Sequence, residues 1–239
     1  MINNPQEISL CELTTMIKRG ISPAYAENGI PVFNQRCIRD SIVNLDLRRR
    51  TDPEKRKIAD EKLVRLWDVL VNSTGVGTLG RVAQIKKNVD ISTVDSHVTI
   101  VRPDLKKVDG QYFGYAINAK QSNIEAMGEG ATGQTELSRV RLGEEIAIPL
   151  PPILTQRKIS YVLSVYDNLI ENNTRRIQIL EEIAQRIYKE WFVDFKYPGH
   201  ENDKLVDSEL GMIPEGWGVK KLNFFGEIIT GSTPSKKVS

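Results

Sequence analysis

The sequence is poor in the residues that build disulfide frameworks and zinc sites. It contains two cysteines and two histidines among 239 residues. Cys11 and Cys37 are too far apart in the sequence to form a Cys-x-x-Cys pair, and His97 and His200 alone do not complete a Cys/His zinc site. These absences favour a reduced, cytoplasmic protein without a metal of its own.

Long apolar runs are also missing. No stretch approaches the roughly 20 apolar residues that cross a bilayer, and the opening MINNPQEISL has neither the basic nor the apolar segment of a signal peptide. Neither secretion nor a membrane span is expected. The net charge of +2 permits nucleic-acid binding without arguing for it, because binders can confine positive charge to one face.

Residues 1–152 mix short strand patterns with helix patterns. Strands are predicted at GIPVFNQ, DVLVN, HVTIVRP and EEIAIPLPP, and a helix at QYFGYAINAKQSNIEAM despite its central Gly114. A further helix is predicted to start at TDPE, residues 51–54. Its apolar face would consist of Ile58, Ala59, Leu63 and Leu66. Many short strands with a few helices indicate a mixed α/β domain.

Residues 155–191 form one long helix pattern. Apolar residues recur there at alternating steps of four and three, the heptad spacing of a coiled coil. The positions of this seam are Ile159, Leu163, Tyr166, Ile170, Asn173, Ile177, Leu180, Ala184, Ile187 and Trp191. A helix of this length is roughly 55 Å long. It has an apolar stripe that it must bury, so a partner helix is expected.

Asn173 places an amide at one seam position. A polar residue there costs stability but disfavours shifted registers, in which the amide would face apolar side chains. Asn173 is also the midpoint of residues 155–191, which places it near the two-fold axis of an antiparallel pair. The alternative is an ordinary surface asparagine on a helix that is not a strict coiled coil.

The helix and its flanks are similar to a known family. The segment IPLPPILTQRKISYVLSVYDNLIENNTRRIQILEEIAQRIYKEWFVDF, followed by LGMIPEGW, resembles the central region of the DNA specificity subunit of type I restriction–modification enzymes. The stretches GTLGRV, DSHVTIVRP and GATGQTELSRVRL resemble a target recognition domain of that family. Family members usually carry two recognition domains and two spacer helices, so this chain resembles a half-length form.

The resemblance implies three parts. Residues 1–152 would be the target recognition domain, residues 153–196 the dimerising spacer helix, and residues 197–239 the start of a second recognition domain. A faint repeat agrees with the last of these, since GSTP at 231–234 echoes GISP at 20–23. Two chains would pair their helices as an antiparallel coiled coil, and their two domains would read an interrupted palindrome in double-stranded DNA.

The resemblance also implies partners. The chain would assemble with methyltransferase subunits and, through the complex, with restriction/translocase subunits. S-adenosylmethionine, ATP and magnesium would bind those subunits, and no cofactor would bind this chain. The sequence itself contains no GxGxxG fingerprint, no Walker A loop, no Asn/Asp-Pro-Pro-aromatic loop and no paired carboxylates typical of a nuclease, so a non-catalytic subunit is expected.

DNA contacts are expected from residues 1–152. The candidates for contact with phosphates or bases are Arg48, Arg49, Arg50, Lys55, Arg81, Lys86 and Lys87. Thr132, Gln134 and Thr135 lie in a glycine-flanked loop that can enter a groove, where a glutamine can pair with adenine. Asn34, Gln35 and His97 are further candidates.

Simpler interpretations stand beside these. The basic cluster can be a solvated helix start, Thr135 can cap a helix over ELSRVRL, and His97 can pack in a sheet. For the whole chain, the alternatives are a coiled-coil adaptor without a DNA-reading function and an enzyme with an unrecognised site. A fragment of a full-length subunit is a third possibility.

Overall fold

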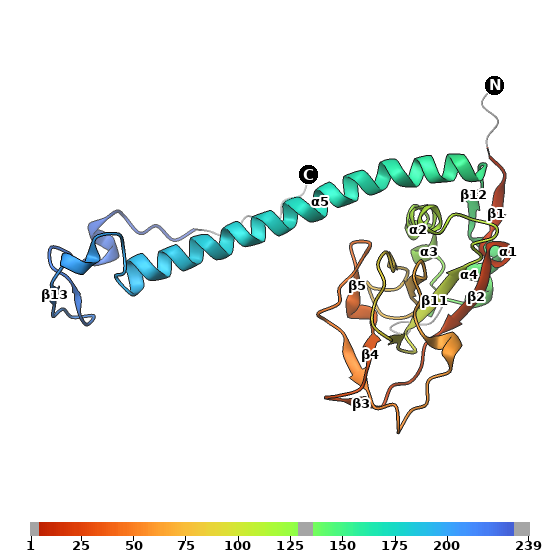
Figure 1. The fold of residues 1–239 in the computed structure, drawn as a ribbon, viewed down its shortest axis with the longest axis horizontal. Coiled ribbons are helices and arrows are strands. Elements are labelled where there is room, and N and C mark those ends of the chain that lie inside the picture. The colour runs from red at the N-terminus through yellow and green to blue at the C-terminus, as the bar shows by residue number, and fades with distance from the viewer. Residues whose placement is uncertain (1–4, 129–135, 232–239) are drawn as a thin grey trace. The chain divides into compact units, whose positions relative to one another are not determined.

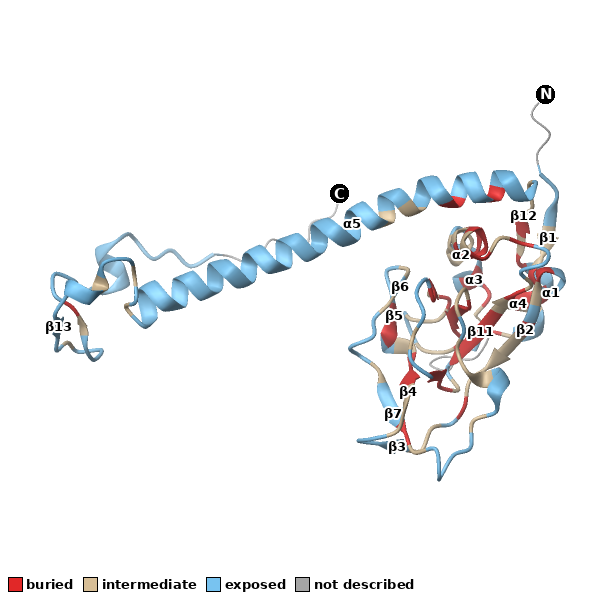
Figure 2. Cartoon of the chain, viewed as in Figure 1, coloured by how far each residue is buried: buried red, intermediate tan, exposed pale blue. Residues whose placement is uncertain are grey.

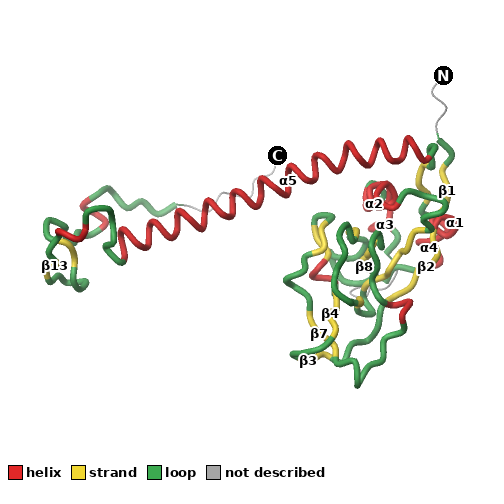
Figure 3. Tube along the Cα trace, viewed as in Figure 1, coloured by secondary structure: helices red, strands yellow, loops and turns green. Residues whose placement is uncertain are grey.

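The computed structural model of the chain describes residues 5–128 and 136–231 (Figure 1). The chain divides into two units, Met1–Asp167 and Asn168–Ser239, and each is described by itself. The first unit is a mixed α/β domain of short strands and helices joined by loops (Figure 3). The mixed α/β class predicted from the sequence is therefore confirmed.

A four-stranded antiparallel sheet forms the centre of the first unit. Its strand order is β2 (Thr14–Arg19), β11 (Val98–Pro103), β8 (Val69–Asn72) and β9 (Val82–Gln84). Every residue of β8 and β9 is buried. Both faces of these strands are therefore covered, and Val69, Leu70 and Val71 are apolar in succession, whereas Asn72 and Gln84 are buried polar residues.

The two faces of this sheet bury different partners. Val69 and Val71 belong to one apolar cluster, together with the buried side chains of the helices. These helices are α1 (Leu10–Leu13), α2 (Gly110–Asn118), α3 (Gln121–Ala126) and α4 (Arg139–Glu145). Leu70 faces the other way, into a second cluster that contains Phe33 and Val94. Figure 2 shows the buried residues of the domain concentrated in these strands and helices.

A second four-stranded sheet supplies part of the second cluster. Its order is β10 (Thr93–Val94), β4 (Ile30–Phe33), β7 (Arg49–Thr51) and β3 (Tyr25–Ala26), with β10 parallel to β4. Two smaller sheets pair β1 (Glu7–Ser9) with β12 (Ala147–Pro149) and β5 (Ile38–Arg39) with β6 (Ile42–Val43). The four strands predicted from the sequence correspond to β4, β8, β11 and β12 and are confirmed.

The predicted helix around Gly114 is confirmed, but it is divided into α2 and α3 by a break at Ala119 and Lys120. Gly114 lies against the side chain of Gln84, whose amide is held in place because Nε2 donates to the carbonyls of Trp67 (3.2 Å) and Gly110 (2.7 Å). A Cβ at residue 114 would approach Gln84 Oε1 to 2.1 Å. The glycine thus serves close packing between α2 and β9.

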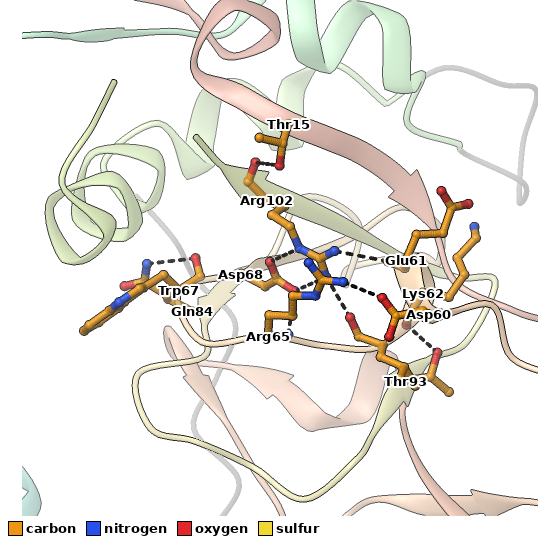
Figure 4. A network of polar contacts seen from close by, with 11 residues as sticks. Thr15, Asp60, Glu61, Lys62, Arg65, Trp67, Asp68, Gln84, Thr93 and Arg102 are labelled. Carbon is orange, nitrogen blue, oxygen red and sulfur yellow. Dashed lines mark hydrogen bonds and ion pairs between the residues drawn. The ribbon is translucent and has the colours of Figure 1, made fainter. Parts of the chain in front are cut away.

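The helix predicted to begin at residues 51–54 is wrong. Thr51 is fully buried in β7, and residues 52–68 contain only one 3₁₀ turn, Asp60–Lys62. Arg102 on β11 donates hydrogen bonds to the carbonyl oxygens of Glu61 (3.3 Å) and Leu63 (2.7 Å) (Figure 4). These carbonyls would accept the next hydrogen bonds of a helix, so tertiary contacts replace the helical ones.

The spacer helix is α5, Ile153–Tyr188, which continues through one π-helical turn, Lys189–Val193. The prediction of a long helix is confirmed. Its first residues, to Asp167, belong to the first unit and the remainder to the second. The described remainder of the second unit consists of the 3₁₀ turn His200–Asn202, the hairpin β13 (Leu205–Val206)–β14 (Ile213–Pro214) and the 3₁₀ turn Leu222–Phe224.

Aromatic contacts organise the segment after the helix. The ring of Trp217 lies 6.1 Å from that of Phe192, 5.4 Å from that of Phe195 and 6.0 Å from that of Tyr197. Through these ring contacts, the IPEGW segment packs against the end of the helix. The predicted repeat at 231–234 lies almost wholly outside the described residues.

Candidate nucleic-acid interface

Three segments distant in the sequence meet at the loop between β8 and β9, residues 73–81, which we call the Thr74 loop. Gln35 Nε2 donates to the carbonyl oxygen of Thr74 (2.5 Å) and to its hydroxyl oxygen (2.6 Å). A hydrogen bond of 2.8 Å joins the same hydroxyl to His97 Nδ1. The interpretation of His97 as a residue packed in a sheet is therefore wrong, because its side chain is exposed in the turn between β10 and β11.

Three glycines allow the backbone of the Thr74 loop to turn sharply. Gly75, Gly77 and Gly80 have positive φ angles of 102°, 71° and 83°, which favour glycine. Between them, Val76 is 79% exposed at the tip of the loop. Arg81 Nη2 donates to the carbonyl oxygen of Gly77 (2.8 Å), so this guanidinium braces the loop.

Residues 136 and 137 lie beside the Thr74 loop. Glu136 forms an antiparallel bridge with Thr74, and the Leu137 amide donates to the Ser73 carbonyl (2.8 Å). Arg19 holds this segment through an ion pair with Glu136 (2.5 Å) and a hydrogen bond to the Leu137 carbonyl (3.1 Å). The glycine-flanked loop of the sequence therefore ends against the Thr74 loop.

Three candidate residues in that loop, Thr132, Gln134 and Thr135, lie outside the described residues. The suggestion that Thr135 caps the following helix is wrong. The helix α4 begins at Arg139, and Ser138 is its N-cap, accepting a hydrogen bond from the Arg141 amide. Capping therefore needs no contribution from Thr135.

The basic cluster lies on the second sheet. Arg49 and Arg50 are in β7 and Arg48 directly precedes it, so the interpretation of these residues as a helix start is wrong. Arg48 Nε donates to the Leu45 carbonyl (2.6 Å), and Arg50 Nη1 donates to the Gly29 carbonyl (2.9 Å). A pocket of about 220 Å³ is lined by Pro31, Leu45, Asp46, Arg48, Arg49 and Arg50. It presents fixed guanidinium groups to solvent.

Arg49 is further oriented by an aromatic ring. Its guanidinium carbon lies 3.4 Å from the centroid of the Tyr25 ring. Burial and the nearby Asp95 carboxylate raise the pKa of Tyr25, although Arg49 itself lowers it. The phenol therefore remains neutral at physiological pH, and the contact is a cation–π interaction.

The remaining candidate residues differ in burial and in their contacts. Asn34 is buried, and its side chain caps the turn Gln35–Cys37. Lys86 pairs with Asp167 of α5 (2.5 Å). Lys55 and Lys87 are exposed. Among all these residues, the structure brings together Gln35, His97 and the Thr74 loop.

The seam of α5 is uncovered in the single chain. Its residues, Asn173 included, are all exposed, and its large apolar members range from 37% exposed at Trp191 to 64% at Leu180. Only Gln156 and Ser160 of this helix are buried (Figure 2). A heptad stripe in water leaves its apolar surface unburied.

Within residues 5–128 and 136–231, no cluster of histidine, cysteine, aspartate and glutamate side chains could hold a metal ion. No helix of this described part combines the length and apolar character needed to cross a membrane.

Comparison with known proteins identifies the family. The family model of the type I restriction modification DNA specificity domain matches residues 52–182. The chain belongs to this family. The specificity-subunit class expected from the sequence is thereby confirmed, and it is the DNA-recognition class of such systems rather than a catalytic one.

Two relatives illustrate the relationship. The MjaX specificity subunit of Methanocaldococcus jannaschii is 26% identical over 233 residues, 94% of this chain and 54% of that protein. The HindI specificity subunit of Haemophilus influenzae is 22% identical, over 74% of this chain and 50% of that protein. The chain thus spans about half the length of these curated relatives.

Solved specificity subunits have the same fold. The S subunit from M. genitalium superposes with a TM-score of 0.62 at 19% identity, over 87% of this chain and 53% of that one. The HsdS subunit from Thermoanaerobacter tengcongensis gives a TM-score of 0.53 at 19% identity, over 84% and 46% of the two chains. In both, this chain corresponds to roughly half of the matched protein.

Sequence reasoning missed the residues that connect the segments. Thr74, Arg19 and Asp167 were not among the candidates, although each joins parts of the chain more than 30 positions apart. Gly75, Gly77 and Gly80 are the local signal for the turn in this loop. Its partners depend on sheet pairing, which a single sequence does not reveal.

Proposed function

We propose that this chain is the non-catalytic DNA-recognition subunit of a type I restriction–modification system. Each chain reads one half-site, and two chains form a homodimer that reads an interrupted palindrome. The observation that carries this proposal is the exposed heptad seam of α5. A second copy of α5 is an occupant with the matching apolar stripe.

The dimer follows from the symmetry of the seam. An antiparallel pair with its two-fold axis near Asn173 places the same residues of both helices against each other. The two Asn173 amides then lie close enough to satisfy one another, whereas a shifted register leaves each facing apolar side chains. The seam thereby specifies one alignment of the two recognition domains.

We assign base reading to the Thr74 loop and to the loop that ends beside it at Glu136, with Thr132, Gln134 and Thr135. The pinning of Thr74 by Gln35 and His97 supports this assignment, because a rigid loop positions side chains in a groove. Exposed Val76 suits contact with a thymine methyl group. The fixed guanidinium groups of Arg48, Arg49 and Arg50 suit phosphate oxygens, with Lys55 and Lys87 as weaker contacts.

Catalysis belongs to partner subunits in this proposal. Methyltransferase subunits would bind S-adenosylmethionine, and restriction/translocase subunits would bind ATP and magnesium, in the cytoplasm. This chain would connect those subunits to double-stranded DNA. A coiled-coil adaptor without DNA reading remains the competing function, supported by the same exposed helix seam.

Two measurements test the proposal. The solution mass of the isolated chain should be that of a dimer. With the methyltransferase subunit added, selection of bound duplexes from a random pool should return a two-fold symmetric consensus with a gap. A single asymmetric half-site bound by a monomer contradicts the dimer, and a dimer without salt-dependent duplex binding favours the adaptor.

A further inference from the structure

A polar cluster joins the spacer helix to the recognition domain. Asp167 of α5 accepts a hydrogen bond from the Nζ atom of Lys86 (2.5 Å), a residue that lies just after β9. It accepts another from the hydroxyl group of Tyr115 in α2 (2.7 Å). The Lys86 ammonium also lies 4.7 Å from the centroid of the Tyr115 ring. One carboxylate of the helix is thus held by two different elements of the domain.

A second attachment lies near the start of the helix. Gln156, which is 2% exposed, accepts a hydrogen bond from the Asp109 amide (2.9 Å), and its Nε2 donates to the Pro151 carbonyl (2.8 Å). Ser160 is also buried and donates to the Asp109 carboxylate (3.5 Å). Eleven residues separate Gln156 from Asp167, which corresponds to roughly 16 Å along the helix.

The attached side and the seam of α5 are adjacent. Gln156, Ser160 and Asp167 lie at helical spacings of four and seven, so they share one side. At about 100° per residue, Ile159 and Tyr166 of the seam lie roughly a quarter-turn away, whereas Leu163 borders the attached side. Ile159, Leu163 and Tyr166 remain 38%, 39% and 62% exposed with the domain attached, so the helix can contact its own domain and a second helix at the same time.

We infer that the cluster of Asp167, Lys86 and Tyr115 is a positioning device that fixes the angle of the recognition domain on its helix, and so sets the number of base pairs between the two half-sites. This inference rests on the proposed function. Without the cluster, the domain loses two hydrogen bonds to the helix roughly three turns beyond Gln156. The domain would then pivot more readily about the attachment at Gln156 and Ser160.

The consequence for DNA follows from the size of a base pair. Successive base pairs are about 3.4 Å apart, so a pivot that moves each domain by a few ångströms changes the gap by one or more base pairs. Both domains of a symmetric dimer would move. The cluster thus affects the gap, whereas the Thr74 loop affects the bases of each half-site.

The experiment uses the chain assembled with its methyltransferase subunit. Binding is measured to duplexes that carry two copies of the selected half-site, inverted, with the gap varied one base pair at a time. The wild-type complex should prefer one gap. Asp167→Ala and Lys86→Met should reduce that preference several-fold over the neighbouring gaps, while the half-site consensus from a random pool stays unchanged.

Two control variants separate the inference from loss of folding. Ser164→Ala changes the same side of the helix, but its hydroxyl donates to the Tyr161 carbonyl of its own helix (2.8 Å), so the gap preference should persist. Lys86→Arg keeps a cationic donor and should retain most of the preference. Circular dichroism should report the same helix content in all variants.

Three outcomes would contradict the positioning role, the role of Lys86 or the proposed function. An unchanged gap preference in Asp167→Ala contradicts the positioning role. If Lys86→Met weakens binding equally at every gap and Asp167→Ala does not, Lys86 is a phosphate contact instead. If the wild-type complex selects no gapped, two-fold consensus, the proposed function fails.

Discussion

At the scale of single residues, the buried pair of Asp68 and Arg102 organises one side of the domain. Arg102 Nε and Nη2 each donate to an Asp68 carboxylate oxygen at 2.8 Å, and the Arg65 amide donates to the same carboxylate (2.7 Å) (Figure 4). Burial raises the pKa of Asp68, although its hydrogen bonds and the Arg102 charge lower it. The carboxylate therefore depends on Arg102 to remain charged.

Arg102→Ala should destabilise the domain by about 3–5 kcal/mol, because it leaves a buried carboxylate without its partner. Urea denaturation measures the change. Arg65→Ala is the matched control, since the Arg65–Asp60 pair is exposed and such pairs contribute at most about 1 kcal/mol. Equal effects of the two substitutions would contradict the assigned role of Arg102.

Gly114→Ala should also destabilise the domain, although alanine ordinarily favours a helix by about 1 kcal/mol over glycine. The added Cβ collides with the Gln84 side chain, and overpacking of this kind costs about 1–3 kcal/mol. Thermal unfolding measures the loss. A double-mutant cycle with Gln84→Ala should show strong coupling. Additive effects would mean that Gln84 is not the obstacle.

At the scale of elements, α5 combines an anchored beginning with an uncovered seam. Asn173 is the one polar member of that seam with a proposed role in alignment. Asn173→Leu should raise the melting temperature of the dimer while allowing more than one helix register. Differential scanning calorimetry and cross-linking between engineered cysteines would measure the two effects. An unchanged melting temperature would mean that Asn173 is not at a buried seam.

The anchor at Asp167 should be sensitive to acid. Burial alone would raise the pKa of Asp167, but the hydrogen bonds from Lys86 and Tyr115 and the Lys86 charge hold it below its ordinary value. The folded pKa lies below the unfolded one, so the stabilising contribution is present above about pH 4 and is lost as the pH falls through the folded value. The stability difference between wild type and Asp167→Asn should therefore shrink in acid, as measured by urea denaturation.

At the scale of the whole molecule, reading two half-sites requires two recognition domains, and the proposed dimer supplies them. Ile177→Asp places a charge in the seam and should convert the dimer to a monomer, because a buried unpaired charge costs far more than the pairing can offset. Analytical ultracentrifugation measures the mass. Arg176→Asp, at a neighbouring position outside the seam, should leave a dimer. A dimeric Ile177→Asp chain would place the interface elsewhere.

Local patterns in the sequence determined the elements that depend on neighbouring residues. The heptad spacing specified α5, and the strand patterns DVLVN and HVTIVRP specified β8 and β11. The exposed seam also follows from periodicity, since i, i+3 and i+4 positions share one side of any helix. These features arise from backbone geometry and from packing between residues that are close together in the sequence, so the sequence alone predicts them.

Contacts between distant segments determined the rest. The pattern after residue 51 predicted a helix, yet Arg102 binds the carbonyl groups of Glu61 and Leu63, and only the 3₁₀ turn Asp60–Lys62 forms. Gln35 follows β4, Thr74 follows β8 and His97 precedes β11, yet the three side chains meet, and Asp167 of α5 meets Lys86, which follows β9. Such meetings depend on sheet order and packing across the core, which no local pattern records.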